Sequence, residues 1–106
     1  MDKSNLRMDM LRQYLKEDPY DDFSEYALAL EFENKGNRIE ALFHLEQILN
    51  RNADYLAAYY QCGKMYEAEK DTTKAMDRYQ QGMEIAKRQE DEKTYNELRT
   101  ALEMMD

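Results

Sequence analysis

The sequence predicts an all-α protein built from antiparallel helical hairpins, with about six helices. Between residues 55 and 88, apolar and small side chains recur at helical spacing on two consecutive segments, which a polar interruption at Asp71 and Thr72 separates. The composition agrees, because one proline, three glycines and no valine leave no alternating β-branched run that would predict a strand. A weaker copy of the same pattern lies 34 residues earlier.

Large and small side chains alternate on the two helical faces of residues 55–88. They are Tyr59, Cys62, Gly63 and Tyr66 on the first face and Ala75, Tyr79 and Gly82 on the second. Because small residues leave room for large ones opposite them, the two backbones are expected to approach closely as an interlocking hairpin. The corresponding positions of the earlier copy are Leu28, Ala29, Phe32, Ala41, Leu45 and Ile48.

The period and the residue pattern resemble those of a known family. An aromatic-x-x-apolar-Gly-x-x-Tyr run is followed by Ala-x-x-x-Tyr-x-x-Gly, and the period is 34 residues. This pattern is similar to that of the tetratricopeptide repeat family. The resemblance, closest to small bacterial members of the family, implies hairpins stacked into a short right-handed superhelix.

Each predicted helix boundary has a local cause. The six helices are expected at about residues 5–17, 22–35, 38–51, 55–70, 73–88 and 92–105. Pro19 pushes Asp18 out of helical geometry, which ends the first helix. Gly36 suits the positive φ of a turn after the second helix. Asn37 and Asp54 are suitable caps for the third and fourth helices, and Ser4 or Asn5 for the first.

The last predicted helix departs from the 34-residue period. A shift of 36 residues, rather than 34, aligns Tyr95, Leu98 and Leu102 with the packing positions of the fourth helix. We therefore expect a two-residue insertion at residues 89–91. Arg99 occupies the place of a small residue, so this helix is predicted to close the stack rather than begin another hairpin.

The resemblance implies a single tetratricopeptide repeat domain over residues 1–106. Its expected parts are an N-terminal half-repeat or capping helix at 1–20, a first repeat at 22–53, a second repeat at 54–88 and a C-terminal capping helix at 91–106. Repeats of this kind bury their apolar faces mainly against their neighbours, so terminal caps are needed.

Charge and composition argue against several classes of function. The formal net charge of −8, without a Lys/Arg cluster, disfavours nucleic acid and anionic membranes and favours a basic or apolar partner. His44 has no second ligand at metal-binding spacing, and we interpret it as structural; a nucleophile pair with Cys62 is the minor alternative. No phosphate loop or catalytic motif is present, so neither enzymatic activity nor a metal or other cofactor is expected. Without an apolar signal segment, a cytoplasmic location is expected.

The resemblance also indicates where a ligand would bind. In this family the first helix of each hairpin lines an inner groove, which is implied here for Phe23, Tyr26, Leu30, Glu33, Asn34, Tyr60, Lys64 and Glu67. The Lys/Asn/Arg clamp that some members use for carboxylates is largely absent, so an apolar or aromatic peptide is expected, with Lys64 and Glu67 orienting it. The aromatic positions are either an open interface or core covered by a terminal helix.

These observations leave two hypotheses open for function. The first is an adaptor that binds a protein or peptide segment in the groove. The second is structural self-association, in which two copies form a homodimer through their aromatic grooves and no separate ligand exists.

Overall fold

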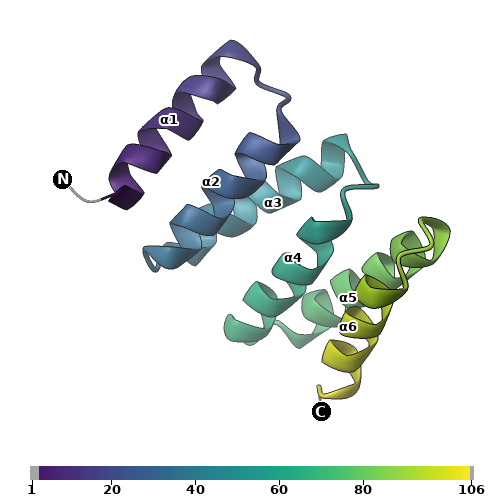
Figure 1. Cartoon of the computed structure of the whole chain (residues 1–106). Helices are drawn as coiled ribbons and strands as arrows, with labels where there is room; N and C mark the ends of the chain where they lie inside the picture. Colours follow the sequence, from purple (N-terminus) through teal and green to yellow (C-terminus); the bar gives the residue numbers. More distant parts are fainter. Residues whose placement is uncertain (1–2, 106) are drawn as a thin grey trace. The chain divides into compact units, whose positions relative to one another are not determined.

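Six α-helices make up the fold in the computed structural model, which describes residues 3–105 (Figure 1). They are α1 (Lys3–Glu17), α2 (Asp22–Asn34), α3 (Arg38–Arg51), α4 (Leu56–Ala68), α5 (Thr72–Arg88) and α6 (Glu92–Glu103). No strand occurs among these residues. The predicted all-α hairpin architecture is confirmed, and most boundaries agree within two residues. α1 begins at Lys3, ahead of the cap predicted at Ser4 or Asn5, and the N-cap of α4 is Tyr55 and not the predicted Asp54.

The described chain divides after Arg51 into two compact units. In the first unit, α2 and α3 form a hairpin and α1 packs against α2. The buried core of this unit includes Met8, Leu28, Ala29, Ala41, Leu45 and Ile48. Two contacts hold α1 in place: Arg7 donates to Glu31 at 2.6 Å, and the Arg12 guanidinium lies over the Phe32 ring at 5.6 Å.

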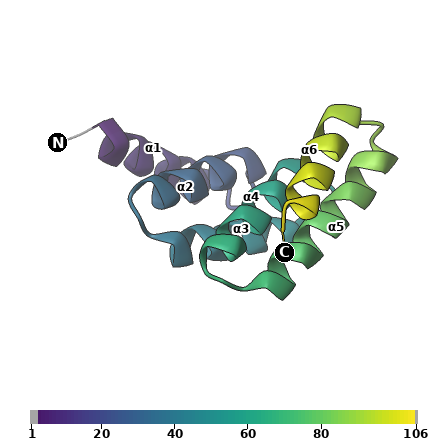
Figure 2. The same ribbon diagram turned by 90° about the horizontal axis from the view of Figure 1, so that it is seen from below.

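In the second unit, α4 and α5 form a hairpin and α6 packs against α5. Figures 1 and 2 both show α5 and α6 side by side. The buried core of this unit includes Ala58, Tyr59, Cys62, Ala75, Tyr79, Ala86 and Leu98. The Tyr59 hydroxyl is satisfied by donating to the Ala53 carbonyl at 2.6 Å.

The glycines of the second unit are required by the close approach of the helices. A Cβ at Gly63 would lie 2.2 Å from Cε1 of Tyr79, and one at Gly82 would lie 2.7 Å from Cβ of Tyr59. Cys62 and Tyr79 are fully buried beside these glycines. The predicted alternation of large and small residues is therefore confirmed as an interlocking contact between α4 and α5.

Three turns share one geometry. Gly36, Lys70 and Glu90 all have positive φ, and the next backbone N–H in each turn bonds back to a carbonyl in the last turn of the preceding helix. Asn37, Asp71 and Asp91 follow them and accept hydrogen bonds from the first turn of the next helix. The α5–α6 connection therefore repeats the turn found inside the two hairpins.

The two-residue insertion lies in a different place from the one predicted. The interval between the starts of α4 and α6 is 36 residues, as the shifted register requires. However, α5 has 17 residues where α3 has 14, and the connection after it is one residue shorter than the one after α3. The prediction of an insertion at residues 89–91 was wrong, because extending α5 adds backbone hydrogen bonds and a longer loop would not.

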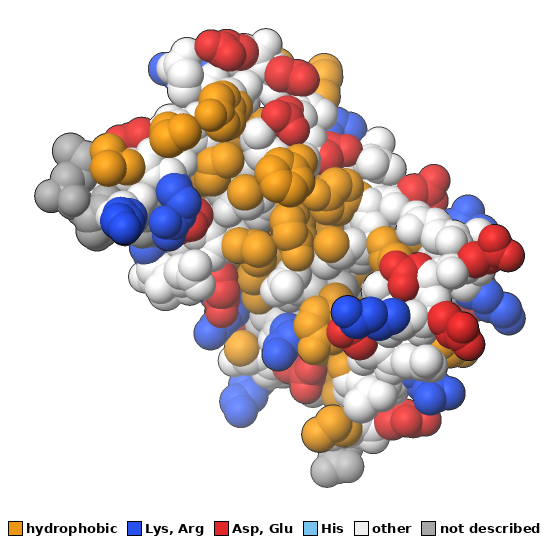
Figure 3. All heavy atoms as spheres, in the orientation of Figure 1, with side chains coloured by type: hydrophobic (Ala, Val, Ile, Leu, Met, Phe, Trp, Pro, Cys, Tyr) orange, Lys and Arg blue, Asp and Glu red, His pale blue; other side chains and the backbone are white. Residues whose placement is uncertain are grey.

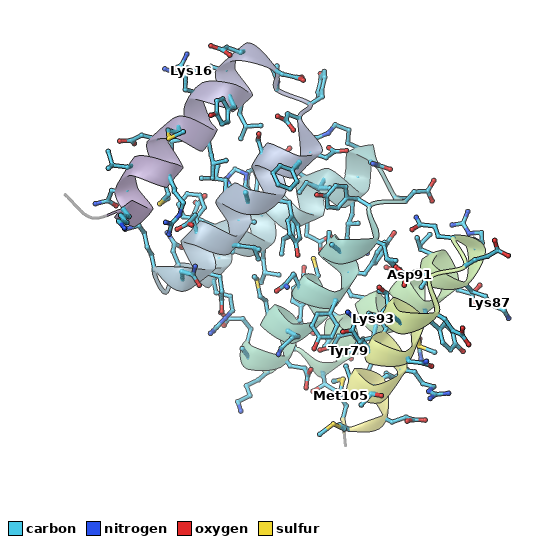
Figure 4. The ribbon with its side chains drawn as sticks, viewed as in Figure 1. Lys16, Tyr79, Lys87, Asp91, Lys93 and Met105 are labelled. Atoms are coloured by element: carbon cyan, nitrogen blue, oxygen red, sulfur yellow. The ribbon has the colours of Figure 1, made fainter. Side chains whose placement is uncertain are left out.

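Capping by Asp91 gives a prediction about acid stability. Hydrogen bonds from the backbone N–H and hydroxyl of Thr94 lower the pKa of Asp91 below its usual value (Figure 4). A carboxylate with a lowered pKa stabilises the fold fully above its unfolded pKa of about 4 and loses this contribution as the pH falls below it. Asp91→Asn should keep the cap but not titrate, so its melting temperature should fall less than that of the wild type between pH 7 and pH 3.

Circular dichroism melts at the two pH values provide the measurement. Asp77→Asn, on the exposed surface of α5, is a matched control that should follow the wild type. An equal acid loss in Asp91→Asn and the wild type would contradict the role assigned to the Asp91 carboxylate.

Candidate functional site

In the first unit, the predicted groove residues occupy one face of α2. Phe23 is 72% exposed, Tyr26 and Leu30 are half-buried, and Asn34 is exposed. Glu33 forms an ion pair with Arg38 at 3.4 Å within the unit. The opposite face of α2 is buried. Phe23 is therefore the most accessible apolar group on the predicted face.

In the second unit, the predicted residues lie on one face of α4 and are engaged with their neighbours. The half-buried Tyr60 ring lies 6.3 Å from the ring of Tyr79, centroid to centroid, and packs against the core that includes Leu98. Of the two alternatives left open for the aromatic positions, Tyr60 is therefore closer to the covered one, because it packs against this core instead of lying fully open.

The charged residues of this face are also held. Lys64 lies over the Tyr60 ring, with Nζ 5.6 Å from its centroid, and Glu67 accepts a hydrogen bond from the Tyr79 hydroxyl. Desolvation by burial, followed by the bond to Glu67, raises the pKa of Tyr79. Glu67 therefore positions a buried tyrosine, and its predicted role in orienting a ligand is not needed to explain it.

A hollow of about 340 Å³ lies between α4 and α6. Tyr60 of α4 lines it, together with Asn96, Glu97, Thr100, Ala101 and Met104 from the C-terminal helix and its cap. Tyr60, Ala101 and Met104 give the hollow apolar walls. The amide, hydroxyl and carboxylate beside them can hydrogen-bond to a peptide backbone or to a basic side chain.

A buried polar network links α2 to α3 in the first unit. Glu25, which is 5% exposed, accepts from Arg51 at 2.8 Å and lies 2.9 Å from Nδ1 of His44. Arg51 also donates from Nε to Asp22 at 2.9 Å. The His44 ring stacks on Phe32, with centroids 5.5 Å apart. The network satisfies His44 as a structural residue, as its isolation in the sequence predicted.

Among residues 3–105, no group of three or more metal-ligating side chains gathers at a site. Nor does any helix in this range have the length and apolar character needed to cross a membrane. Cys62 is buried in the second unit.

Comparison with known proteins identifies the family. No protein-family model matches the sequence, and no curated protein matches it. Among solved structures, the crystal structure of a tetratricopeptide repeat domain protein from Salinibacter ruber is 38% identical, covers 77% of this chain and 91% of its own, and superposes with a TM-score of 0.74. The chain belongs to the tetratricopeptide repeat family.

A second structure supports this assignment to the tetratricopeptide repeat family, and a third shares the fold. A solution NMR structure of a tetratricopeptide repeat domain protein from Salinibacter ruber is 39% identical over 80% of this chain and 86% of its own, with a TM-score of 0.76. MamA, at 18% identity, shares the fold over 85% of this chain and 53% of its own, with a TM-score of 0.80. The tetratricopeptide fold is in general that of a protein-interaction or scaffold module, and proteins of this family are generally non-enzymatic.

The α6 residues that line the hollow could have been found from the repeat alignment of the sequence. In the alignment of α6 with α4 by a shift of 36 residues, Asn96 is equivalent to Tyr60 and Thr100 is equivalent to Lys64. Both α6 residues line the hollow. Applying the groove positions of a tetratricopeptide hairpin to the predicted capping helix would therefore have found them.

Proposed function

We propose that the protein binds a polypeptide segment, and that the hollow between α4 and α6 receives an apolar or aromatic side chain of that segment. The observation that carries the proposal is the lining of the hollow, which combines the Tyr60 ring with the exposed side chain of Met104. Concave sites with apolar walls and few polar groups are typical of ligand pockets, and methionine adapts its shape to different ligands.

The charge of the lining supports a more specific ligand. Glu97 lies at the hollow, and the chain as a whole has a net charge of −8. A basic residue next to the apolar one would therefore be attracted, whereas a nucleic acid backbone would be repelled.

The 72% exposed Phe23 of α2 is a second apolar contact on the other unit, and we propose it as an independent part of the binding surface. The four-part domain division and the cytoplasmic location stay predictions.

Random peptides displayed on phage and selected on the immobilised protein test the proposal. We expect enriched peptides to contain an aromatic or large aliphatic residue beside Lys or Arg. Thr100→Lys adds a bulky positive charge to the exposed wall of the hollow and should weaken a selected peptide at least tenfold, which corresponds to about 1.4 kcal/mol. Isothermal titration calorimetry measures the change.

Glu103→Gln is the matched control, because it changes the charge by the same amount on the same helix without lining the hollow. It should leave the affinity unchanged. Equal affinity of the wild type and Thr100→Lys for every selected peptide would contradict the hollow as the binding site. Phe23→Ala should weaken only peptides that reach α2, and a homodimer that Phe23→Ala dissociates would instead favour self-association through the aromatic face.

A further inference from the structure

One face of α1 presents a row of large apolar side chains that no other element of its unit covers. Leu6, Met10 and Tyr14 follow each other at intervals of four residues, and their exposed fractions are 50%, 54% and 45%. This spacing places them along a single stripe of the helix. Figure 3 shows hydrophobic side chains gathered over α1 and α2. Single exposed apolar residues are ordinary, whereas a continuous row on one helix indicates an interface.

The stripe is distinct from the face that holds α1 in its own unit. Met8 is 4% exposed, and Leu15 is half-buried. The helical positions of Leu6, Met10 and Tyr14 lie about 100° or more around the axis from those of Met8 and Leu15. The stripe therefore remains available while α1 is docked on α2.

The ends of the stripe carry opposite charges. Lys3 lies at its N-terminal end and Glu17 at its C-terminal end, and both are exposed. When two copies of α1 lie antiparallel with Met10 on a two-fold axis, Leu6 faces Tyr14 of the partner subunit and Lys3 faces Glu17 of the partner subunit. The antiparallel arrangement also sets the two helix dipoles in opposite directions, which is favourable. A stripe that complements itself in this way is suited to a symmetric interface.

We propose that two copies of this chain associate through antiparallel pairing of their α1 helices. A standard protein–protein interface buries about 1,600 Å², and a single pair of helices buries less. The dimer is therefore weak, and its population depends on the protein concentration. The proposed contact is made by residues of α1, so the residues proposed to bind a peptide are not part of it.

Charge reversal tests both the contact and its direction. Lys3→Glu places two glutamates together at each end of the dimer, and Glu17→Lys places two lysines together. Each variant alone should dimerise about tenfold more weakly than the wild type at low ionic strength. An equimolar mixture of the two variants should regain association, because at one end of the mixed dimer the introduced glutamate faces the introduced lysine and at the other end the native pair is kept. Sedimentation velocity over a concentration series measures all four samples.

Lys16→Glu is the matched control, since it makes the same charge change on the exposed surface of α1 away from the stripe (Figure 4). It should leave association unchanged. Met10→Lys, at the axis, should abolish the dimer while circular dichroism shows an intact fold. A wild type that stays monomeric at millimolar concentration would overturn the proposal. So would a mixture that fails to recover, or a dimer that Phe23→Ala dissociates and Met10→Lys does not.

Discussion

Gly63→Ala is expected to destabilise the second unit by about 2 kcal/mol or more. The new Cβ would lie 2.2 Å from the Tyr79 ring, and Tyr79 is fully buried and held through its hydroxyl by Glu67. Overpacking of this kind costs about 3 kcal/mol, and the better helix propensity of alanine returns about 1 kcal/mol. Urea unfolding followed by circular dichroism measures the loss.

A double-mutant cycle shows whether the loss comes from this contact. Tyr79→Leu removes the ring atoms that Gly63→Ala would meet, so the combined cost should be clearly less than the sum of the two single costs. Gly36→Ala is the control for losing a glycine without crowding, because nothing lies within 4 Å of its Cβ position and only its positive φ is disturbed. A glycine-to-alanine change at an exposed helix position stabilises a protein. If Gly63→Ala had the same effect, the interlocking contact would be refuted.

Leu98→Ala is expected to cost about 3 kcal/mol. Leu98 is fully buried, and its side chain lies against the backbone of α5 at Gly82, where a Cβ would be 3.0 Å from Leu98 Cδ1. Truncation removes buried methyl groups and leaves a cavity between α5 and α6 that the helices can only partly fill. Denaturant unfolding measures the change in free energy of the unit.

Met104→Ala provides the comparison for Leu98→Ala. Met104 follows the same helix but is 79% exposed, so its truncation should change stability by no more than about 0.5 kcal/mol. If the two variants were equally stable, α6 would not be part of the cooperative unit. The wall that it gives to the hollow would then lack structural support.

The fold was predictable because its signals are local. The 34-residue period and the small residues at Gly63 and Gly82 can be recognised from neighbouring residues, and the structure confirms them. Of the predicted caps, Asn37 is confirmed, whereas Tyr55 takes the place of Asp54 as the N-cap of α4. The position of the insertion was not predictable in this way. A 36-residue offset is satisfied equally by a longer loop or a longer helix, and only the packed structure shows that α5 was extended.

The candidate site was predictable only in part, because side chains from other helices decide its character. Glu31 is 8% exposed and paired with Arg7 of α1. Glu25 is buried because Arg51 and His44 reach it from α3. Each partner comes from a different helix than the glutamate it contacts. The helical periodicity of a single segment therefore could not predict these pairs.

We propose that polypeptide binding uses the hollow between α4 and α6 and, separately, the exposed face of α2. Titration of a selected peptide into a ¹⁵N-labelled sample, followed by amide chemical-shift mapping, tests this claim most directly. We predict that the largest shifts fall at Tyr60 on α4 and at Asn96 and Thr100 on α6, with a separate group near Phe23 on α2 for peptides that reach it. Shifts confined to α3 and α5, with the amides around the α4–α6 hollow unchanged, would contradict the claim.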